Sequence, residues 1–179
     1  MPSDIAVYGL GVMGRNIALN MADHGLTVSV YNRTASTTED FVADLPPDSG
    51  IRASYELADL AASLTLPRVV FLMAKAGRVV DRVIEGLLPH LEPGDVVIDG
   101  GNSHFRDSQR RYEDLRQRGV RFLGMGISGG EEGARHGPSI MPGGDPEAWP
   151  LVREMFQDIA ASAEDGEPCC RWVGEGGAG

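Results

Sequence analysis

The amino-acid sequence predicts an α/β fold, a Rossmann-like doubly wound and mainly parallel sheet with helices on both faces. Apolar runs of strand length, several rich in valine or isoleucine, alternate along the chain with stretches of helical period. A Gly-x-Gly-x-x-Gly turn at residues 9–14 follows the first run and opens the first helical stretch. Such alternation is typical of βαβ units, whose strands are parallel and buried on both faces.

Each element follows from its local pattern. The apolar runs predict strands at residues 5–8, 27–31, 69–73, 96–98, 120–123 and 171–173. The stretches between them predict helices at residues 13–24, 37–44, 55–63, 79–88, 108–118 and 147–161. Turn residues lie where these elements end, with Gly25 after the first helix, two prolines at 46–47 and a Pro-Gly pair at 93–94.

A second glycine-rich segment, residues 124–144, follows the predicted strand at 120–123. Each glycine raises the entropy cost of ordering the backbone, so neither a helix nor a sheet requires so many of them. Polar residues are interleaved with the glycines, namely Ser128, Glu131, Glu132, Arg135 and His136. At the carboxyl end of a strand this composition predicts a ligand-facing loop. The alternative is a mobile surface loop.

Length and composition bound the class of protein. The 179 residues fit one domain, residues 1–179, with a full hydrophobic core. The net charge of −10 argues against nonspecific binding to nucleic acid or to anionic membranes, so neither is expected as a partner. The sequence shows no signal-peptide pattern and no apolar run of membrane-spanning length. The adjacent Cys169 and Cys170 indicate a reducing, cytoplasmic setting, and the scattered histidines lack the spacing of a metal site.

The turn at residues 9–14 has the context that a dinucleotide site requires. The first glycine permits a tight turn, the second lets the backbone approach a pyrophosphate, and the third packs helix against strand. The helix that follows offers unpaired N–H groups and a partial positive charge to the phosphates. The alternative is a turn that serves packing alone.

The second strand ends in Asn32, Arg33 and Thr34, about 20 residues past the glycine turn, where cofactor choice is made. An NAD site normally places a carboxylate there to hold the ribose hydroxyls. Arg33 can instead pair with a 2′-phosphate, and Asn32 and Thr34 can donate to its oxygens. NADP is therefore the predicted cofactor. The alternative is that Arg33 is a solvated arginine at a helix start.

Two further strand ends carry candidate residues. Ala74, Lys75 and Ala76 follow the strand at 69–73, where small side chains permit close approach to a nucleotide. Lys75 can either screen phosphate charge or face solvent. Asn102 follows the strand at 96–98 and can bridge cofactor and substrate, because its amide both donates and accepts. The charged residues just beyond it are interpreted as an exposed helix face rather than a site, namely Arg106, Asp107, Arg110 and Arg111.

Together these residues resemble the 6-phosphogluconate dehydrogenase family, NADP-dependent decarboxylating enzymes of the pentose phosphate pathway. The resemblance runs from Ile5 to the last residue. Its most specific blocks are Ser-Gly-Gly-Glu-Glu-Gly-Ala-Arg at 128–135 and Met-Pro-Gly-Gly at 141–144. The departures are Ala74, where the family often has valine, and Phe105 and His136, where tyrosine is usual.

The resemblance implies the site residues and the reaction. Cofactor-binding positions would be Gly9, Leu10, Gly11, Val12, Met13, Gly14, Asn32, Arg33, Thr34, Ala74, Lys75, Ala76 and Asn102. Substrate-binding positions would be Asn102, Ser128, Gly129 and Gly130. The implied reaction is oxidative decarboxylation of 6-phosphogluconate to ribulose 5-phosphate and CO2, with reduction of NADP to NADPH.

No catalytic residue is expected within the chain. The family's lysine base and glutamate acid have no matching position, because in the family they lie just past the point where this sequence ends. The family's helical domain, which implies a homodimer for the whole enzyme, is missing as well. We interpret residues 173–179 as the start of the connection to that domain, and we expect the chain to bind NADP(H) without turnover.

Two other functions are also compatible with the sequence. One is a β-hydroxyacid dehydrogenase of the semialdehyde-reducing type, which shares the glycine turn and a looser Ser-Gly-Gly, but not the Glu-Glu-Gly-Ala-Arg run. The other is a stand-alone NADP-sensing module, which would require the chain to end naturally at Gly179.

Overall fold

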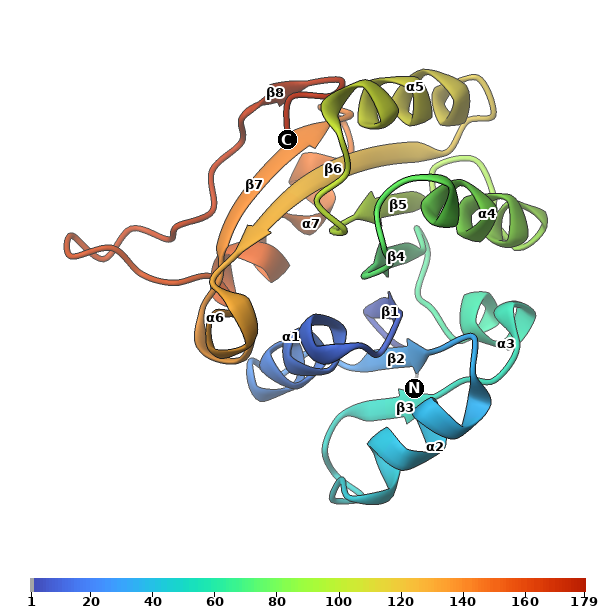
Figure 1. Ribbon diagram of the computed structural model, residues 1–179, viewed down its shortest axis with the longest axis vertical. Helices are drawn as coiled ribbons and strands as arrows, with labels where there is room; N and C mark the ends of the chain where they lie inside the picture. Colours follow the sequence, from blue (N-terminus) through green and yellow to red (C-terminus); the bar gives the residue numbers. More distant parts are fainter. Residues whose placement is uncertain (1) are drawn as a thin grey trace.

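The structure is a computed structural model that describes residues 2–179. Its strands form one eight-stranded sheet in the order β3-β2-β1-β4-β5-β6-β7-β8 (Figure 1). The strands are β1 (Ile5–Tyr8), β2 (Val28–Tyr31), β3 (Ile51–Ala53), β4 (Val69–Leu72), β5 (Val96–Asp99), β6 (Arg121–Ser128), β7 (Ser139–Gly144) and β8 (Gly174–Glu175). The helices are α1 (Val12–Asp23), α2 (Ala35–Ala43), α3 (Leu57–Ala62), α4 (Arg78–Leu87), α5 (Phe105–Arg116), α6 (Gly130–His136) and α7 (Trp149–Asp158).

The sheet has the doubly wound topology that the sequence predicts. Every neighbouring pair of strands is parallel except β6 and β7. The strand order reverses between β1 and β4, which are direct neighbours in the sheet. In open α/β sheets, ligands bind outside the carboxyl ends of the strands at such a reversal. The predicted fold class is therefore confirmed, and the topology predicts a ligand-binding crevice beside the glycine turn.

Two hydrophobic cores lie on the two faces of the sheet. One core joins alternate strand residues to apolar side chains of α1, α2, α6 and α7, for example Ile17 and Phe156. The other joins the remaining strand residues to side chains of α3, α4 and α5, for example Leu60 and Leu115. Within residues 2–179, no helix is both long enough and apolar enough to cross a membrane.

Most predicted elements are confirmed, with shifts of a few residues at their ends. The short edge strand β3 was not predicted, because its residues are only partly buried and carry no apolar run. The last strand is at Gly174–Glu175 rather than at residues 171–173, and it pairs with the end of β7. The glycines after it are held in place, since the Gly177 amide donates to Gln109 of α5.

The prediction that residues 124–144 form one loop is wrong. The segment forms the second half of β6, then α6, then β7. Six residue pairs join β6 and β7, from Leu123 opposite Gly144 to Ser128 opposite Ser139. This ladder and the packing of α6 on α1 offset the entropy cost that made an ordered segment look improbable.

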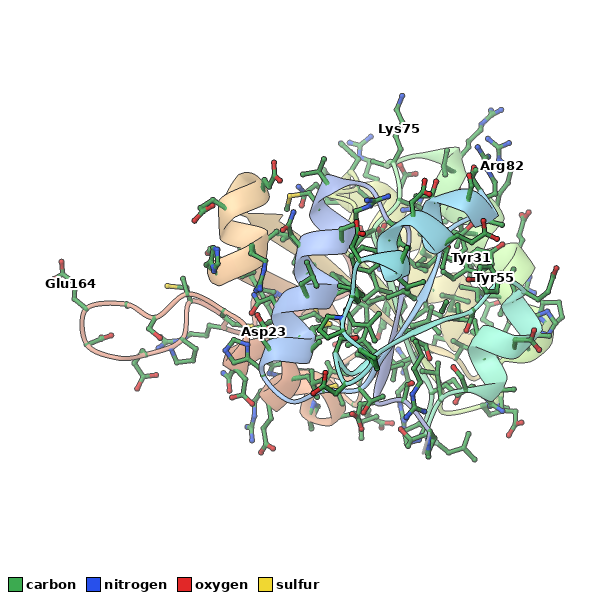
Figure 2. The ribbon with its side chains drawn as sticks, turned by 90° about the horizontal axis from the view of Figure 1, so that it is seen from below. Asp23, Tyr31, Tyr55, Lys75, Arg82 and Glu164 are labelled. Carbon is green, nitrogen blue, oxygen red and sulfur yellow. The ribbon has the colours of Figure 1, made fainter. Side chains whose placement is uncertain are left out.

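A long connection between α7 and β8 extends away from the body of the molecule (Figure 1). Figure 2 shows Glu164 at its tip, far from the other labelled residues. Its base is closed by a bridge between Ser162 and Pro168 and by the Cys169 amide, which donates to the Ala161 carbonyl. The connection leads back to β7, where Cys170 lies buried beside Ile140, and burial raises the pKa of its thiol to about 12.

Candidate functional site

The glycine turn packs three backbones together at the carboxyl end of β1. Gly9 has a φ of 101°, and a side chain there would collide with the Met73 carbonyl oxygen. A side chain at Gly14 would collide with the Gly9 carbonyl oxygen. At Gly11, by contrast, an added Cβ would meet nothing within 4 Å. Two glycines of the motif therefore serve close packing, and the middle one faces open space where a ligand can approach the backbone.

The amino terminus of α1 is presented at this open space. Gly11 precedes the helix, and no side chain caps its first amides. Gly11 and Val12 are exposed, whereas Leu10 is buried and can contribute only its backbone. Unpaired amides at a helix amino terminus attract phosphate groups, which fits the predicted role of this turn.

The end of β2 is tied to the glycine turn by Asn32. Its side-chain oxygen accepts a hydrogen bond from the Leu10 amide at 3.1 Å, and its side-chain nitrogen donates to the Thr34 carbonyl at 3.3 Å. Asn32 therefore links the end of β2 to the glycine turn, and this contact network engages one of the two N–H groups of its amide. Arg33 and Thr34 are both exposed beside it.

A cavity of about 530 Å³ connects these elements with β4 and α4. Its lining includes the predicted residues Gly9, Gly11, Asn32, Arg33, Thr34, Ala74 and Lys75, and also Tyr8, Leu57, Met73, Val79, Arg82 and Val83, which were not predicted. The additional residues come from faces of α3, α4 and the strand ends that only the folded topology brings together. Of the unpredicted residues, Arg82 is the one with charge.

The cavity has the charge that a phosphorylated ligand requires. Among its described lining residues there are three cationic side chains, Arg33, Lys75 and Arg82, and no carboxylate. Lys75 and Arg82 extend from the same end of the molecule (Figure 2). In a chain of net charge −10, this local group of cations supplies the attraction that the whole molecule lacks. The residues therefore fit a dinucleotide with an additional phosphate.

Tyr8 lines the cavity, and the ring of Tyr31, on the neighbouring strand, packs against it. The Tyr8 and Tyr31 rings lie 5.0 Å apart, centroid to centroid. Burial raises the pKa of both hydroxyls above the ordinary value, and the positive charge of Arg33 only partly opposes that shift. Both side chains are thus neutral at physiological pH and add no negative charge near the cations.

Asn102 lies in the turn after β5 and joins it to β6. It has a φ of 54°, in the left-handed region that asparagine tolerates better than most residues. Its side-chain oxygen accepts from the Ile127 amide at 3.0 Å, and its side-chain nitrogen donates to the Ile127 carbonyl at 3.3 Å. These contacts place Asn102 beside Ile127, so the predicted positions Asn102 and Ser128 adjoin each other at this edge of the sheet.

The predicted substrate residues are exposed at the end of β6. Ser128, Gly129 and Gly130 form the junction between β6 and α6. Gly129 and Gly130 have φ values of 134° and 60°, and an added Cβ at Gly130 would meet nothing within 4 Å. The junction offers a hydroxyl and backbone groups to a ligand without bulky side chains between them.

The arginine of the Glu-Glu-Gly-Ala-Arg run does not point to this junction. Arg135 forms an ion pair with Asp23 of α1 at 2.6 Å. Buried Asn20, also on α1, donates to the carbonyl of Ala134 at 3.2 Å and to that of Ile159 at 3.0 Å. The run thus holds α6 against α1, the helix that follows the glycine turn. This contact joins the glycine turn to the junction at residues 128–130.

The prediction that Arg111 belongs to an exposed charged face is wrong. Its side chain is only 2% exposed and forms ion pairs with Asp99 at 3.0 Å and Asp81 at 2.8 Å. The neighbouring Arg110 is 48% exposed and does lie on the surface, where it pairs with Asp81 and Asp107. The helical period of α5 turns Arg111 inward, toward the sheet edge that carries the site.

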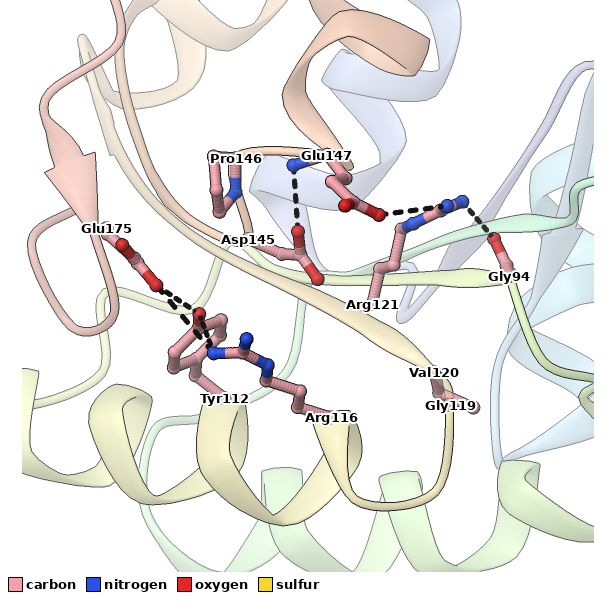
Figure 3. Close-up of a pocket in the computed structure, with 10 residues that line it drawn as sticks. All are labelled: Gly94, Tyr112, Arg116, Gly119, Val120, Arg121, Asp145, Pro146, Glu147 and Glu175. Carbon is pink, nitrogen blue, oxygen red and sulfur yellow. Dashed lines mark hydrogen bonds and ion pairs between the residues drawn. The ribbon is translucent and has the colours of Figure 1, made fainter.

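A second cavity, of about 250 Å³, lies at the opposite edge of the sheet, near the start of β6 (Figure 3). Two ion pairs lie among its lining residues, Arg121 with Glu147 at 3.5 Å and Arg116 with Glu175 at 3.9 Å. The Asp145 carboxylate accepts from the Glu147 amide at 2.8 Å. The Tyr112 hydroxyl donates to Glu175 at 2.5 Å, and this hydrogen bond, together with burial, raises the pKa of Tyr112. These groups satisfy each other and indicate no particular ligand.

Comparison with known proteins gives one family. A model of the NAD binding domain of 6-phosphogluconate dehydrogenase matches residues 4–174. The decarboxylating 6-phosphogluconate dehydrogenase of Chlamydia pneumoniae is 59% identical over 179 residues, which cover 100% of this chain and 37% of that protein. The chain thus spans little more than a third of the length of this curated relative.

Solved structures agree with the sequence comparison. The 6-phosphogluconate dehydrogenase of Plasmodium falciparum, studied with its cofactor NADP+ and its substrate 6-phosphogluconate, matches with a TM-score of 0.91 and 39% identity over 98% of this chain and 38% of that one. A 3-hydroxyisobutyrate dehydrogenase of Mycobacterium tuberculosis matches with a TM-score of 0.82 and 24% identity, over 100% of this chain and 57% of that one. At that identity, the second match shows a shared fold alone.

Proposed function

Because the chain belongs to the family of 6-phosphogluconate dehydrogenase NAD-binding domains, we propose that it binds NADP(H) in the cavity beside the glycine turn. The observation that carries the proposal is the set of cations around this cavity, with Arg33 at the end of β2 where an NAD site normally has a carboxylate. The Plasmodium relative, with NADP+ as its cofactor, supports the same choice.

Three groups of residues would bind three parts of the cofactor: the 2′-phosphate, the pyrophosphate and the nicotinamide. Arg33 and Thr34 would meet the 2′-phosphate, because a guanidinium and a hydroxyl both donate to phosphate oxygens. The exposed backbone at Gly11 and Val12 would meet the pyrophosphate at the amino terminus of α1. Ala74, Lys75, Ala76 and Asn102 would line the nicotinamide end. When bound, the nicotinamide accepts a hydride from the substrate.

For the whole protein we propose oxidative decarboxylation of 6-phosphogluconate to ribulose 5-phosphate and CO2. Asn102, Ser128, Gly129 and Gly130 would hold the sugar acid beside the nicotinamide, through an amide, a hydroxyl and backbone N–H groups. The general base and acid that such a reaction needs are not among the residues assigned here. We therefore expect the 179-residue chain to bind cofactor without turnover. A cytoplasmic homodimer is part of the same proposal for the whole protein.

Cofactor choice is tested by titrating the chain with NADPH and, separately, with NADH, following nicotinamide fluorescence. We expect NADPH to bind about ten- to a hundredfold more tightly, because hydrogen bonds to a charged group contribute about 1.5–3 kcal/mol. Arg33→Ala should remove most of this preference, whereas Arg153→Ala, at an exposed arginine of α7, should leave it unchanged. Equal affinity of the wild-type chain for the two cofactors would overturn the NADP assignment.

Turnover is tested by incubating the chain with NADP and 6-phosphogluconate. We expect no ribulose 5-phosphate above the blank, and production above it would contradict the proposal that catalysis needs residues outside this chain. A substrate panel with a full-length protein separates the decarboxylating reaction from that of a β-hydroxyacid dehydrogenase. The family match and the 59% identity favour the former.

A further inference from the structure

Arg111 is the centre of a buried hydrogen-bond network under the ligand-binding edge of the sheet. Its Nε donates to the Asp81 carboxylate at 2.8 Å. Its Nη1 donates to the Asp99 carboxylate and to the Ser103 hydroxyl, each at 3.0 Å, and its Nη2 donates to the Gly77 carbonyl at 3.0 Å. Four of the five N–H donors of one rigid guanidinium are thus directed at four different groups.

These four groups lie in, or at the ends of, the two turns that carry the proposed cofactor residues. Gly77 ends the turn after β4, immediately past Lys75 and Ala76, and Asp81 lies in the first turn of α4. Asp99 ends β5, and Ser103 is the residue after Asn102. The guanidinium therefore connects the turn after β4 to the turn after β5, and it contacts each of them directly.

The second turn is held further by Asp99. One of its carboxylate oxygens accepts from the Gly101 amide at 2.9 Å, and the other accepts from the Ser103 hydroxyl at 2.6 Å. Gly101 is packed so closely on the first turn that a side chain there would collide with the Ala74 carbonyl oxygen. Asp99 and Arg111 thus hold the residues before and after Asn102, which keeps Asn102 in its left-handed conformation.

We propose that Arg111 is a positioning residue for the nicotinamide end of the cofactor site, which it sets by holding the turns at Ala74–Gly77 and Gly100–Ser103 in fixed relation. The inference rests on the proposed function, which places the cofactor against Ala74, Lys75, Ala76 and Asn102. Arg111 itself is buried and acts through these turns.

A lysine cannot replace this arginine. An ammonium group is a single point charge with three donors, so it cannot reach the Gly77 carbonyl, Asp81 and the Asp99–Ser103 pair together. The pKa of Asp81 agrees with a strong interaction between this carboxylate and the two arginines. Burial tends to raise the pKa, but hydrogen bonds from Arg111 and Arg110 hold it below the ordinary value.

The test compares Arg111→Lys with Arg110→Lys in the 179-residue chain. The control changes the adjacent arginine, which is exposed and also pairs with Asp81, by the same substitution. Each variant is titrated with NADPH and with adenosine 2′,5′-bisphosphate, which carries the adenosine half and the 2′-phosphate but no nicotinamide. Thermal unfolding identifies the temperature range in which both variants are folded.

We expect Arg111→Lys to weaken NADPH binding about tenfold, the equivalent of one hydrogen bond to a charged group, and bisphosphate binding less than about twofold. Arg110→Lys should change neither. An unchanged affinity for NADPH, or an equal loss for both ligands, would overturn the inference, because a merely structural role predicts loss of both or neither.

Hydrogen exchange of the ligand-free chain tests the positioning independently of binding. Arg111→Lys should speed exchange of the amides in residues 74–78 and 100–104 about tenfold, and Arg110→Lys should not. Unchanged exchange in both turns contradicts the inference whether or not the chain binds cofactor. Failure of the wild-type chain to bind either ligand, with exchange altered as expected, would contradict the proposed function alone.

Discussion

Two glycine-rich segments reach the same edge of the sheet, and they use glycine in different ways. In residues 9–14, one short turn packs the backbones of β1, α1 and β4 together, and Gly11 alone faces open space. In residues 124–144, the glycines are distributed over a strand, a helix and a second strand. There Gly143 and Gly144 admit neighbouring backbone, while Gly130 faces open space.

The cations around the two segments differ as well. The first segment borders a cavity with Arg33, Lys75 and Arg82 at its surface. In the second segment, Arg135 is paired with Asp23 and holds α6 on α1. The first region therefore has the charge to hold phosphates by itself, while the second offers Ser128 and backbone groups. Two segments of similar composition thus differ in their surroundings: cations border the first, whereas an ion pair docks a helix in the second.

The largest expected effect separates the packing glycines from the ligand-facing one. Gly14→Ala should destabilise the chain by about 3 kcal/mol, because its methyl group meets the Gly9 carbonyl. Gly11→Ala should change stability by less than about 0.5 kcal/mol, since Gly11 has a φ of −68° and open space around it. It should nevertheless weaken NADPH binding at least about tenfold. Urea unfolding and NADPH titration measure the two effects, and normal binding by Gly11→Ala would show that no ligand approaches this turn.

A smaller effect tests the docking of α6. Asn20→Ala should cost about 2 kcal/mol, because it leaves the buried Ala134 and Ile159 carbonyls without their donor. Arg135→Ala removes a partly exposed ion pair in the same contact and should cost less than about 1 kcal/mol. Urea unfolding compares them. If Arg135→Ala were the more damaging variant, the ion pair rather than the buried amide would hold the helix.

The smallest expected effect concerns Arg82, the third cation of the cavity that we propose binds the cofactor. Arg82→Ala should weaken NADPH binding about fivefold, equivalent to about 1 kcal/mol for an exposed charge interaction. Arg78→Ala, one turn earlier on α4 and also exposed, is the matched control and should have no effect. Titration at low and high salt measures both, because screening should reduce the difference. Equal losses in the two variants would indicate that NADPH is attracted by the overall positive charge of this region rather than by a contact with Arg82.

Much of the fold could be predicted from local patterns. The buried parallel strands are continuous apolar runs, and the glycine turn marks the first βα junction, so the doubly wound class follows from the sequence. β7 and α6 could not be predicted this way. Their glycines lower every local propensity, and their order comes from the ladder with β6 and from Asn20, which is distant in sequence.

The residues of the candidate site likewise fall into two groups, those that could be predicted from the sequence and those that could not. Arg33 and Asn102 come within four residues of the ends of predicted strands, so their positions at the carboxyl edge could be inferred from chain order. Arg82 and Arg111 lie on helices, where a charged residue is ordinarily exposed to solvent. Only the rotation of α4 and α5 against the sheet decides that Arg82 borders the cavity and that Arg111 is buried.

By itself, the sequence determined the fold class, the dinucleotide turn and the candidate residues at the strand ends, because apolar runs and turn residues act over a few neighbouring positions. Only the tertiary structure decided that residues 124–144 are ordered, that Arg135 docks a helix and that Arg111 joins two turns. Those outcomes depend on contacts between residues far apart in the chain, such as Asn20 with Ala134, whose energy no local pattern contains.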